Sequence, residues 1–306
     1  MSLTRKQFDV LTSIEETKNS LSQREISDKI GYGLGTVNKV IKELTDSGYL
    51  ETGKITEKGL DALEPYRVKR AVIIAAGFGS RMVPVTLNTP KPLVRVHGKR
   101  IIDSILDAIV EVGIEEIYLV RGYLGEQFDQ LLYKYPMIRF VENPDYNEAN
   151  NISSAMRAKE LLQNAYVFEA DLLLHNPKII KKYQYTSCFY GIPMDRSDDW
   201  CFTTKNGIIM SQVVGGELKE EEKKRKIKLY QEVGISYWTI EDGQKLERDI
   251  EAAYKMPGGK ERYWDQVPFV CFRGTYQVEI KECRVEDIIE IDTFNELKKV
   301  DRIYDV

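Results

Sequence analysis

Histidine is scarce in this sequence: His97 and His175 are the only two in 306 residues. This scarcity excludes a metal site built mainly on histidines, and we do not expect histidine to act as a general acid or base. The four cysteines form no C-x-x-C pair of the kind that binds zinc, and we expect reduced thiols rather than disulfides. Any chemistry must therefore depend on carboxylates, lysine and arginine.

Long apolar runs and excess positive charge are also missing. No stretch approaches the ~20 apolar residues that cross a bilayer. The N-terminal segment lacks the apolar core of a signal peptide, so we expect a cytoplasmic protein with no membrane partner. The net charge of −4 gives no overall attraction to nucleic acid. The chain is long enough for two domains.

Residues 1–65 predict a small helical domain. Apolar residues recur at helical spacing in the first segment, and Ser22 with Glu25 forms a capping-box signature for the second helix. The expected elements are helices over 8–14, 22–30, 36–47 and 57–63 and a hairpin over 49–56. This order resembles the winged helix-turn-helix of bacterial regulators, which implies that the third helix reads DNA.

The charge of this first domain leaves its role open. Residues 1–66 hold nine Lys or Arg and eleven Asp or Glu, a net charge of −2, whereas a DNA-binding domain usually has a basic face. Asn38, Lys39 and Lys42, with Thr36, could still form a local one. The alternative is a module used for packing, dimerisation or sensing.

From Ala71 onward, strands and helices alternate. Parallel βαβ units with ligands at the carboxyl ends of the strands are the expected result. The expected strands are 71–76, 116–120, 138–142 and 166–170, and the helices are 101–112, 125–135 and 153–162. After Asp171 the strands follow one another without regular helices, which indicates a mixed sheet. We therefore predict an α/β, Rossmann-like domain over residues 66–306, with the charged run 217–228 as a solvated helix or loop.

A buried strand over Ala71–Ala76 ends in a loop that is suited to a polyphosphate. Gly77 and Gly79 would let backbone N–H groups approach phosphate oxygens. Arg81 follows at once, and Lys91 lies ten residues later between two prolines, so both supply positive charge.

The joint pattern AAGFGSR (75–81), TPKPLV (89–94) and Gly98–Lys99 resembles the nucleotidyltransferase superfamily of sugar-phosphate and choline-phosphate pyrophosphorylases. Other strings resemble the choline-phosphate cytidylyltransferases of that superfamily. They are RGYLGEQF (121–128), YNEANNISSAMRAKE (146–160), EADLLL (169–174), DDW (198–200), GISYW (234–238), RYWD (262–265) and IIEIDT (288–293). The string EADL stands where the resemblance leads us to expect one like DADN.

The resemblance implies transfer of a cytidylyl group from CTP to phosphocholine, with Mg²⁺ as cofactor. Arg81 and Lys91 would be catalytic, and Asp171 and Asp265 would hold the metal. The implied nucleotide-binding residues are Ala75, Ala76, Gly77, Gly79, Ser80, Tyr123, Asn151 and Ser154. Asn151 and Ser154 could equally be helix caps.

The expected acceptor site is aromatic. Trp200, Tyr263 and Trp264 lie in strings that resemble choline-binding segments, and ring faces are how proteins recognise a quaternary ammonium. Asp198 or Asp199 could add negative charge. A 2-aminoethylphosphonate or sugar 1-phosphate acceptor remains an alternative, as does a DNA-binding regulator whose second domain only senses nucleotide or choline.

Overall fold

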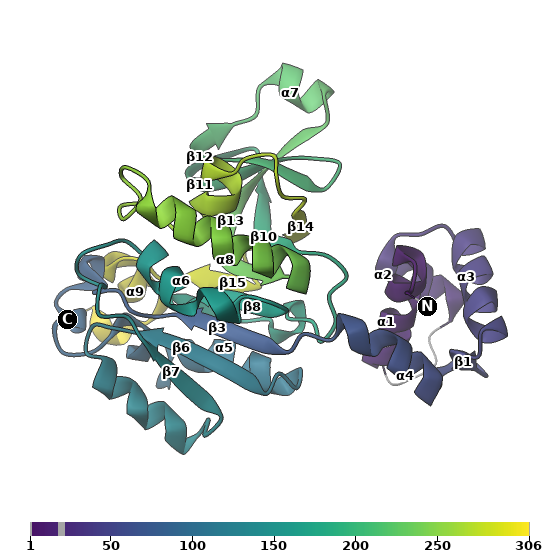
Figure 1. Cartoon of the computed structure of the whole chain (residues 1–306), viewed down its shortest axis with the longest axis horizontal. Helices are drawn as coiled ribbons and strands as arrows, with labels where there is room; N and C mark the ends of the chain where they lie inside the picture. The colour runs from purple at the N-terminus through teal and green to yellow at the C-terminus, as the bar shows by residue number, and fades with distance from the viewer. Residues whose placement is uncertain (1, 18–21, 306) are drawn as a thin grey trace. The chain divides into compact units, whose positions relative to one another are not determined.

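The structure is a computed structural model that describes residues 2–17 and 22–305, and it divides into two compact units (Figure 1). The first unit comprises the residues up to Arg67 together with Tyr183–Tyr185, and the second comprises the rest. The first boundary therefore lies at Arg67, two residues beyond the expected position. The short return of the chain at Tyr183–Tyr185 had no signal in the sequence.

The first unit has the helices and the hairpin of a winged helix. They are α1 (Arg5–Thr17), α2 (Gln23–Ile30), α3 (Leu34–Asp46), β1 (Leu50–Glu51), β2 (Lys54–Ile55) and α4 (Glu57–Leu63). The predicted capping box is present. The Ser22 hydroxyl accepts the N–H of Glu25 at 3.2 Å, and the Glu25 carboxylate accepts the N–H of Ser22 at 2.7 Å.

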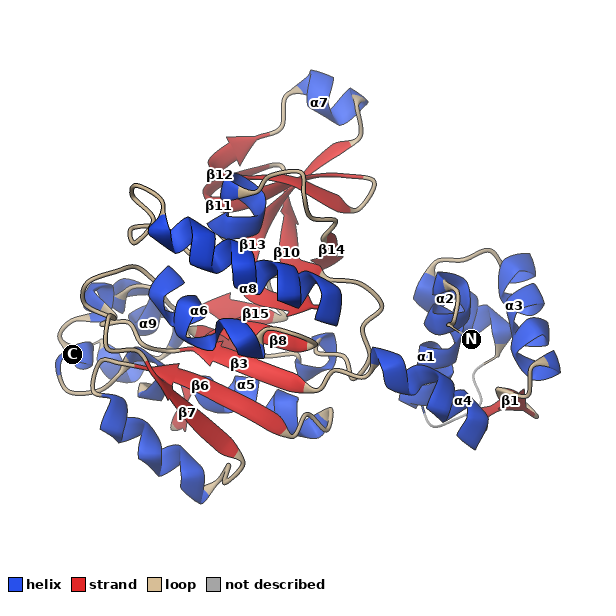
Figure 2. Cartoon of the chain, viewed as in Figure 1, coloured by secondary structure: helices blue, strands red, loops and turns tan. Residues whose placement is uncertain are grey.

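The second unit is built on a mixed nine-stranded sheet in the order β10-β14-β12-β11-β13-β8-β3-β6-β7 (Figure 2). Its strands are β3 (Arg70–Ile74), β6 (Glu116–Arg121), β7 (Ile138–Glu142), β8 (Ala165–Glu169), β10 (Cys188–Met194), β11 (Arg196–Lys205), β12 (Ile208–Glu217), β13 (Ile227–Trp238) and β14 (Glu279–Glu282). Strands β8, β3, β6 and β7 run parallel, and β13 joins them antiparallel to β8. The predicted α/β class with a mixed sheet is confirmed.

Smaller elements complete this unit. They are α5 (Ile101–Glu111), α6 (Ile152–Ala158), α7 (Glu220–Lys224), α8 (Ile240–Lys255), α9 (Phe294–Val300), the hairpin β4 (Arg95–Val96) and β5 (Lys99–Arg100), and the pair β9 (Leu172–Leu174) and β15 (Ile288–Glu290). Helix α7 lies within the charged run and has no buried residue, as a solvated segment should. The segment Gly125–Tyr133 is a 3₁₀-helix rather than the expected α-helix. Its buried residues Gly125, Phe128 and Leu131 recur every third position, which matches three residues per turn.

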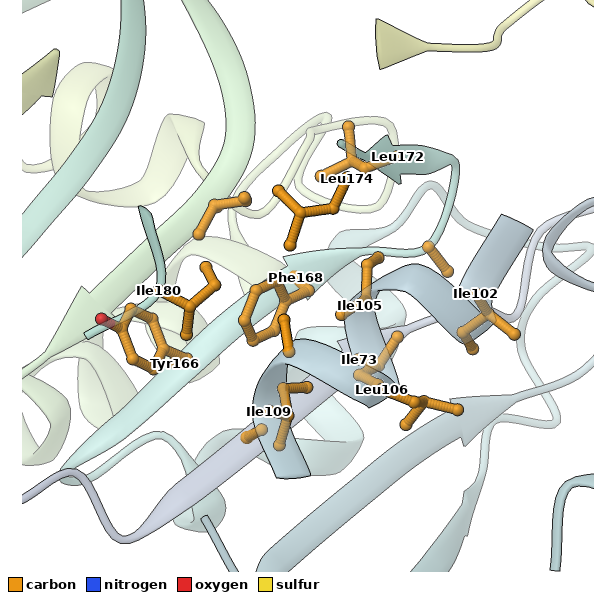
Figure 3. Close-up of a cluster of buried hydrophobic side chains, with 14 of the residues drawn as sticks. Ile73, Ile102, Ile105, Leu106, Ile109, Tyr166, Phe168, Leu172, Leu174 and Ile180 are labelled. Atoms are coloured by element: carbon orange, nitrogen blue, oxygen red, sulfur yellow. The ribbon is translucent and has the colours of Figure 1, made fainter. Parts of the chain in front are cut away.

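Both faces of the sheet are covered by apolar packing, which explains the continuous apolar run in β3. Ala71 and Ile73 point into one core cluster, where they meet residues of α5 (Figure 3). Val72 points to the opposite face, into a cluster with residues of α6 and α8. This alternation follows from the two-residue period of a strand, and a strand buried on both faces needs apolar residues throughout.

All four cysteines are free thiols. Within residues 2–17 and 22–305, no helix has the combination of length and apolar character needed to span a bilayer.

The packing of Tyr185 gives a prediction about truncation. Its ring stacks on Tyr66 with centroids 5.3 Å apart and meets Phe8 at 5.2 Å, so removing residues 1–67 leaves Tyr185 without its partners. Because the two core clusters of the second unit are formed by its own residues, we expect a chain starting at Val68 and carrying Tyr185→Ser to unfold in one cooperative transition. Thermal unfolding followed by circular dichroism would measure this, with the same truncation retaining Tyr185 as the control. A non-cooperative transition in the Tyr185→Ser truncation would show that the second unit is not autonomous.

Candidate active site

A cavity of about 400 Å³ lies in the second unit where β3 and β8 end. Its lining includes the loop after β3, the segment Glu169–Asp171 after β8, and residues from β11 and β13. In sheets of this kind ligands bind at the carboxyl ends of the parallel strands, so the position is the expected one.

The loop after β3 depends on a glycine at position 79. Gly79 has φ of +63°, a left-handed conformation that favours glycine. A Cβ atom there would lie 3.0 Å from Cβ of Lys91 and 3.1 Å from Cγ2 of Thr86, which is too close for either neighbour to stay in place. The Thr86 hydroxyl donates to the Gly79 carbonyl at 2.8 Å. The loop therefore packs directly against the side chain of Lys91.

Lys91 is the cation at the centre of the cavity, with a side chain only 11% exposed. Its ammonium group lies 2.9 Å from Asp171 Oδ2 and 2.8 Å from Asp292 Oδ1. Arg81 meets the other oxygen of Asp292 at 2.9 Å. Burial alone would lower the pKa of Lys91, but the two carboxylates outweigh it and the pKa is raised, so Lys91 is charged.

Three carboxylates beside Lys91 form a group that could hold a divalent cation. One oxygen from each of Glu169, Asp171 and Glu290 lies within 4.8 Å of the others. Oδ1 of Asp171 is buried and has no hydrogen-bond partner, so it is available as a ligand. Burial, and then the charge of Asp171, raises the pKa of both Glu169 and Glu290 well above the ordinary value. A hard cation held by carboxylate oxygens would relieve this repulsion, so the group suits Mg²⁺.

The backbone explains how residues so distant in sequence converge. Strand β15 pairs antiparallel with β9, which places Glu290 opposite Leu172. The N–H of Ile291 donates to the carbonyl of Asp171 at 3.1 Å. On the other side, Gly234 leaves room for Glu169, because a Cβ there would lie 2.7 Å from the Glu169 side chain.

Asp265, the second predicted metal ligand, belongs to a different group. Gln212 donates through Nε2 to Glu232 at 2.8 Å and to Asp265. Asp265 is only 5% exposed, and its Oδ1 has no hydrogen-bond partner. Burial raises the pKa of Asp265, while burial and the neighbouring Asp265 raise that of Glu232. We therefore propose that Glu169 and Glu290, from the strings EADLLL and IIEIDT, accompany Asp171 in the metal group in place of Asp265.

Two of the three predicted acceptor rings line the cavity. Trp200 and Tyr263 meet edge to face with centroids 5.6 Å apart. Trp264 does not line it: its ring is 2% exposed and packs in the core beside Trp238, with centroids 6.2 Å apart. Neighbouring residues of this turn point in opposite directions, so Tyr263 faces the cavity and the apolar ring of Trp264 faces the core. We assign Trp264 to the core, in the same cluster as Trp238.

The acidic residue beside Trp200 is Asp199 rather than Asp198. Asp199 lines the cavity, and its carboxylate accepts the N–H of Trp200 at 2.8 Å. The Asp198 carboxylate is 94% exposed and lies 3.7 Å from Arg196. An irregularity in the pairing of β11 between Ser197 and Trp200 interrupts the regular alternation of side chains, so Asp199 and Trp200 both line the cavity while Asp198 lies in solvent.

Most of the predicted nucleotide-binding residues also lie together. Those lining the cavity are Ala75, Ala76, Gly77, Gly79, Ser80, Asn151 and Ser154. Asn151 precedes α6 without capping it, and its amide donates instead to Glu169 at 3.2 Å. The Ser154 hydroxyl accepts a hydrogen bond from Asn143 at 3.1 Å. Tyr123 lies outside the lining, where its hydroxyl is 3.0 Å from the carbonyl oxygens of Thr86 and Leu87, so its role is to hold the 84–88 segment.

Comparison with protein families agrees with this division of the chain. Residues 71–184 match the MobA-like NTP transferase domain. Residues 1–56 match the MarR family, whose members are winged-helix proteins.

Individual relatives cover almost all of the second unit. The 2-aminoethylphosphonate cytidylyltransferase of Lancefieldella rimae is 35% identical over 238 residues, which span 76% of this chain and 92% of the relative. The choline-phosphate cytidylyltransferase of Streptococcus pneumoniae is 30% identical, over 76% of this chain and 97% of the relative. The solved structure of the CTP:phosphocholine cytidylyltransferase from Streptococcus pneumoniae superposes with a TM-score of 0.66 at 29% identity, covering 78% of this chain and 99% of that one.

Removing one charge from the Glu169–Asp171–Glu290 group should change the dependence on Mg²⁺, whereas removing one from the Asp265–Glu232 group should not. We expect Asp171→Asn and Glu290→Gln each to raise the Mg²⁺ concentration for half-maximal pyrophosphate release by roughly tenfold or more, because each removes a ligand charge. Asp265→Asn should leave that concentration unchanged. Calorimetric titration of Mg²⁺ into the CTP-bound protein gives an independent readout. An equal shift in all three variants would place Asp265 back among the metal ligands.

Proposed function

The chain belongs to the cytidylyltransferases of the MobA-like nucleotidyltransferase family, and we propose that it transfers the cytidylyl group of CTP to 2-aminoethylphosphonate. A phosphonate oxygen of the acceptor attacks the α-phosphorus of CTP. The bond from that phosphorus to the bridging oxygen of the β-phosphate breaks, and pyrophosphate leaves. Both reactants are anions, so catalysis is mainly neutralisation of charge and in-line positioning.

The unpaired carboxylate oxygen of Asp265 is the observation that favours 2-aminoethylphosphonate as the acceptor. A buried carboxylate oxygen without a partner is costly, and Asp265, whose Oδ1 is such an atom, is among the residues that line the cavity, as is Glu232. A primary ammonium has three N–H groups and can donate to both carboxylates, whereas a quaternary ammonium has none. A sugar 1-phosphate would bring no cation to this end of the cavity. The 35% identity to a 2-aminoethylphosphonate cytidylyltransferase supports the same choice.

The opposite end of the cavity would hold the nucleotide. The backbone of the Ala75–Arg81 loop would lie against CTP, with Ser80 and Arg81 at its β- and γ-phosphates. Lys91 would reach both the α-phosphate and the acceptor phosphonate, because its ammonium lies between Asp171 and Asp292. Mg²⁺ held by Glu169, Asp171 and Glu290 would neutralise the triphosphate when bound.

Phosphocholine is the second candidate acceptor, and the ring pair Trp200–Tyr263 favours it. Each ring face can contribute ~0.5–2 kcal/mol to binding of a quaternary ammonium. The Streptococcus pneumoniae cytidylyltransferase found in both the sequence and the structure comparison acts on phosphocholine. The ring pair and the Asp265–Glu232 group therefore predict different acceptors, and this difference can be measured.

An acceptor screen with two variants separates these candidates. We expect the wild type to release pyrophosphate from CTP fastest with 2-aminoethylphosphonate. Asp265→Asn should raise the KM for this acceptor about tenfold or more, because a charged hydrogen bond is weakened, and should leave the KM for CTP unchanged. Trp200→Ala should affect phosphocholine more than 2-aminoethylphosphonate.

Phosphoethanolamine and glucose 1-phosphate complete the panel, since the first shares the primary amine and the second lacks a cation. The proposal is wrong if phosphocholine is preferred by the wild type and Asp265→Asn leaves the acceptor KM values unchanged.

For the first unit we propose DNA binding through α3. Asn38, Lys39 and Lys42 are exposed on this helix, and Lys54 is exposed on the neighbouring hairpin. The buried residues Val37, Val40 and Leu44 fix the orientation of this polar face. The match to the MarR family supports the proposal, although the unit as a whole is slightly acidic.

Binding of the full chain to duplex DNA tests this role. Fluorescence anisotropy at low salt should detect weak binding whose affinity falls as salt rises, because Lys contacts to phosphate release counterions. Lys39→Glu and Lys42→Glu should each weaken it strongly, while Lys6→Glu, at an exposed position on α1, serves as the charge-matched control. Failure of the wild type to bind at any salt concentration would favour a packing or sensing role.

A further inference from the structure

A second cavity, of about 270 Å³, lies next to the candidate active site. Four acidic residues line both cavities: Asp199, Glu232, Glu290 and Asp292. The two spaces are therefore neighbours across a shared acidic wall. The aminoethyl group of the proposed acceptor is far smaller than this additional space.

Apart from Gln231 and Glu296, the rest of the second cavity is lined by apolar residues. Ile192 and Met194 come from β10, Ile288 and Ile289 from β15, and Val285 from the segment before it. Among the residues described by the structure, none that lines this cavity is basic. Phosphate and phosphonate groups are therefore disfavoured here, and an apolar group attached to a cation is the chemistry that suits both walls.

We infer that this cavity accepts an apolar substituent carried by the nitrogen of the acceptor. The inference rests on the proposed function, which places the phosphonate near Lys91 and the amine near Asp265 and Glu232. Glu232 lines both cavities, so an amine bound beside it lies next to the second space, and its substituent must pass the Glu232 side chain to enter that space. The enzyme would then act on N-alkylated aminoethylphosphonates as well as on the parent compound.

The test compares 2-aminoethylphosphonate with its N-propyl derivative. Removing the propyl chain from water should give the derivative a KM no higher than that of the parent, and up to about tenfold lower. Ile192→Phe fills the cavity from β10 and should raise the KM for the N-propyl compound about tenfold, with the parent compound unaffected. Val214→Phe, an exposed position on β12 that lines neither cavity, is the matched control.

Met194→Phe provides a second filling variant if thermal unfolding shows that Ile192→Phe is destabilised. Rejection of the N-propyl compound by the wild type, or an equal effect of filling on both acceptors, would overturn the inference. Turnover of the parent compound reports separately on the proposed function. If the wild type prefers phosphocholine, the KM of phosphocholine is compared instead with the KM of its analogue in which a propyl group replaces one N-methyl group.

Discussion

The ion pairs of Lys91 connect three distant parts of the second unit. Its ammonium joins Asp171, 80 residues later in the chain, and Asp292, 201 residues later. Without this cation, the carboxylates of Asp171, Asp292 and Glu290 would face one another in a poorly solvated space. Removing one partner of a buried pair costs ~3–5 kcal/mol, so the arrangement of the cavity depends on this lysine. Gly79 allows the loop to approach the Lys91 side chain closely, which helps to hold the ammonium in reach of both partners.

The two ends of the cavity are formed by the parallel and the antiparallel parts of one mixed sheet. The nucleotide end uses loops after the parallel strands β3 and β8. The acceptor end uses the antiparallel strands β11, β12 and β13, which carry Trp200, Gln212 and Glu232. Strand β13 belongs to both, because it also pairs with β8. Substitutions on the antiparallel strands can therefore alter the acceptor while the phosphate-binding loop stays intact.

The parts of the site that are local in sequence could be predicted, and those formed by tertiary convergence could not. The loop 75–81 and Lys91 carry their chemistry in a contiguous, glycine- and proline-marked segment, and the Ser22–Glu25 capping box is equally local. The partnership of Asp171 with Glu290 depends on pairing between β9 and β15, which no periodicity reveals. Likewise, a turn decides that Tyr263 faces the cavity and Trp264 the core, and the string RYWD alone does not.

The path of the chain between the two units bears on how such a protein could evolve. Because Tyr183–Tyr185 belongs to the first unit, the chain crosses the boundary after Arg67, after Lys182 and after Tyr185. The winged helix is therefore not a simple N-terminal cassette that recombination could exchange at one junction. A new domain fused at this point would need a matching tyrosine segment from the middle of the transferase gene. The two halves are thus expected to be inherited together, with residues 183–185 varying in step with the surface formed by Phe8 and Tyr66.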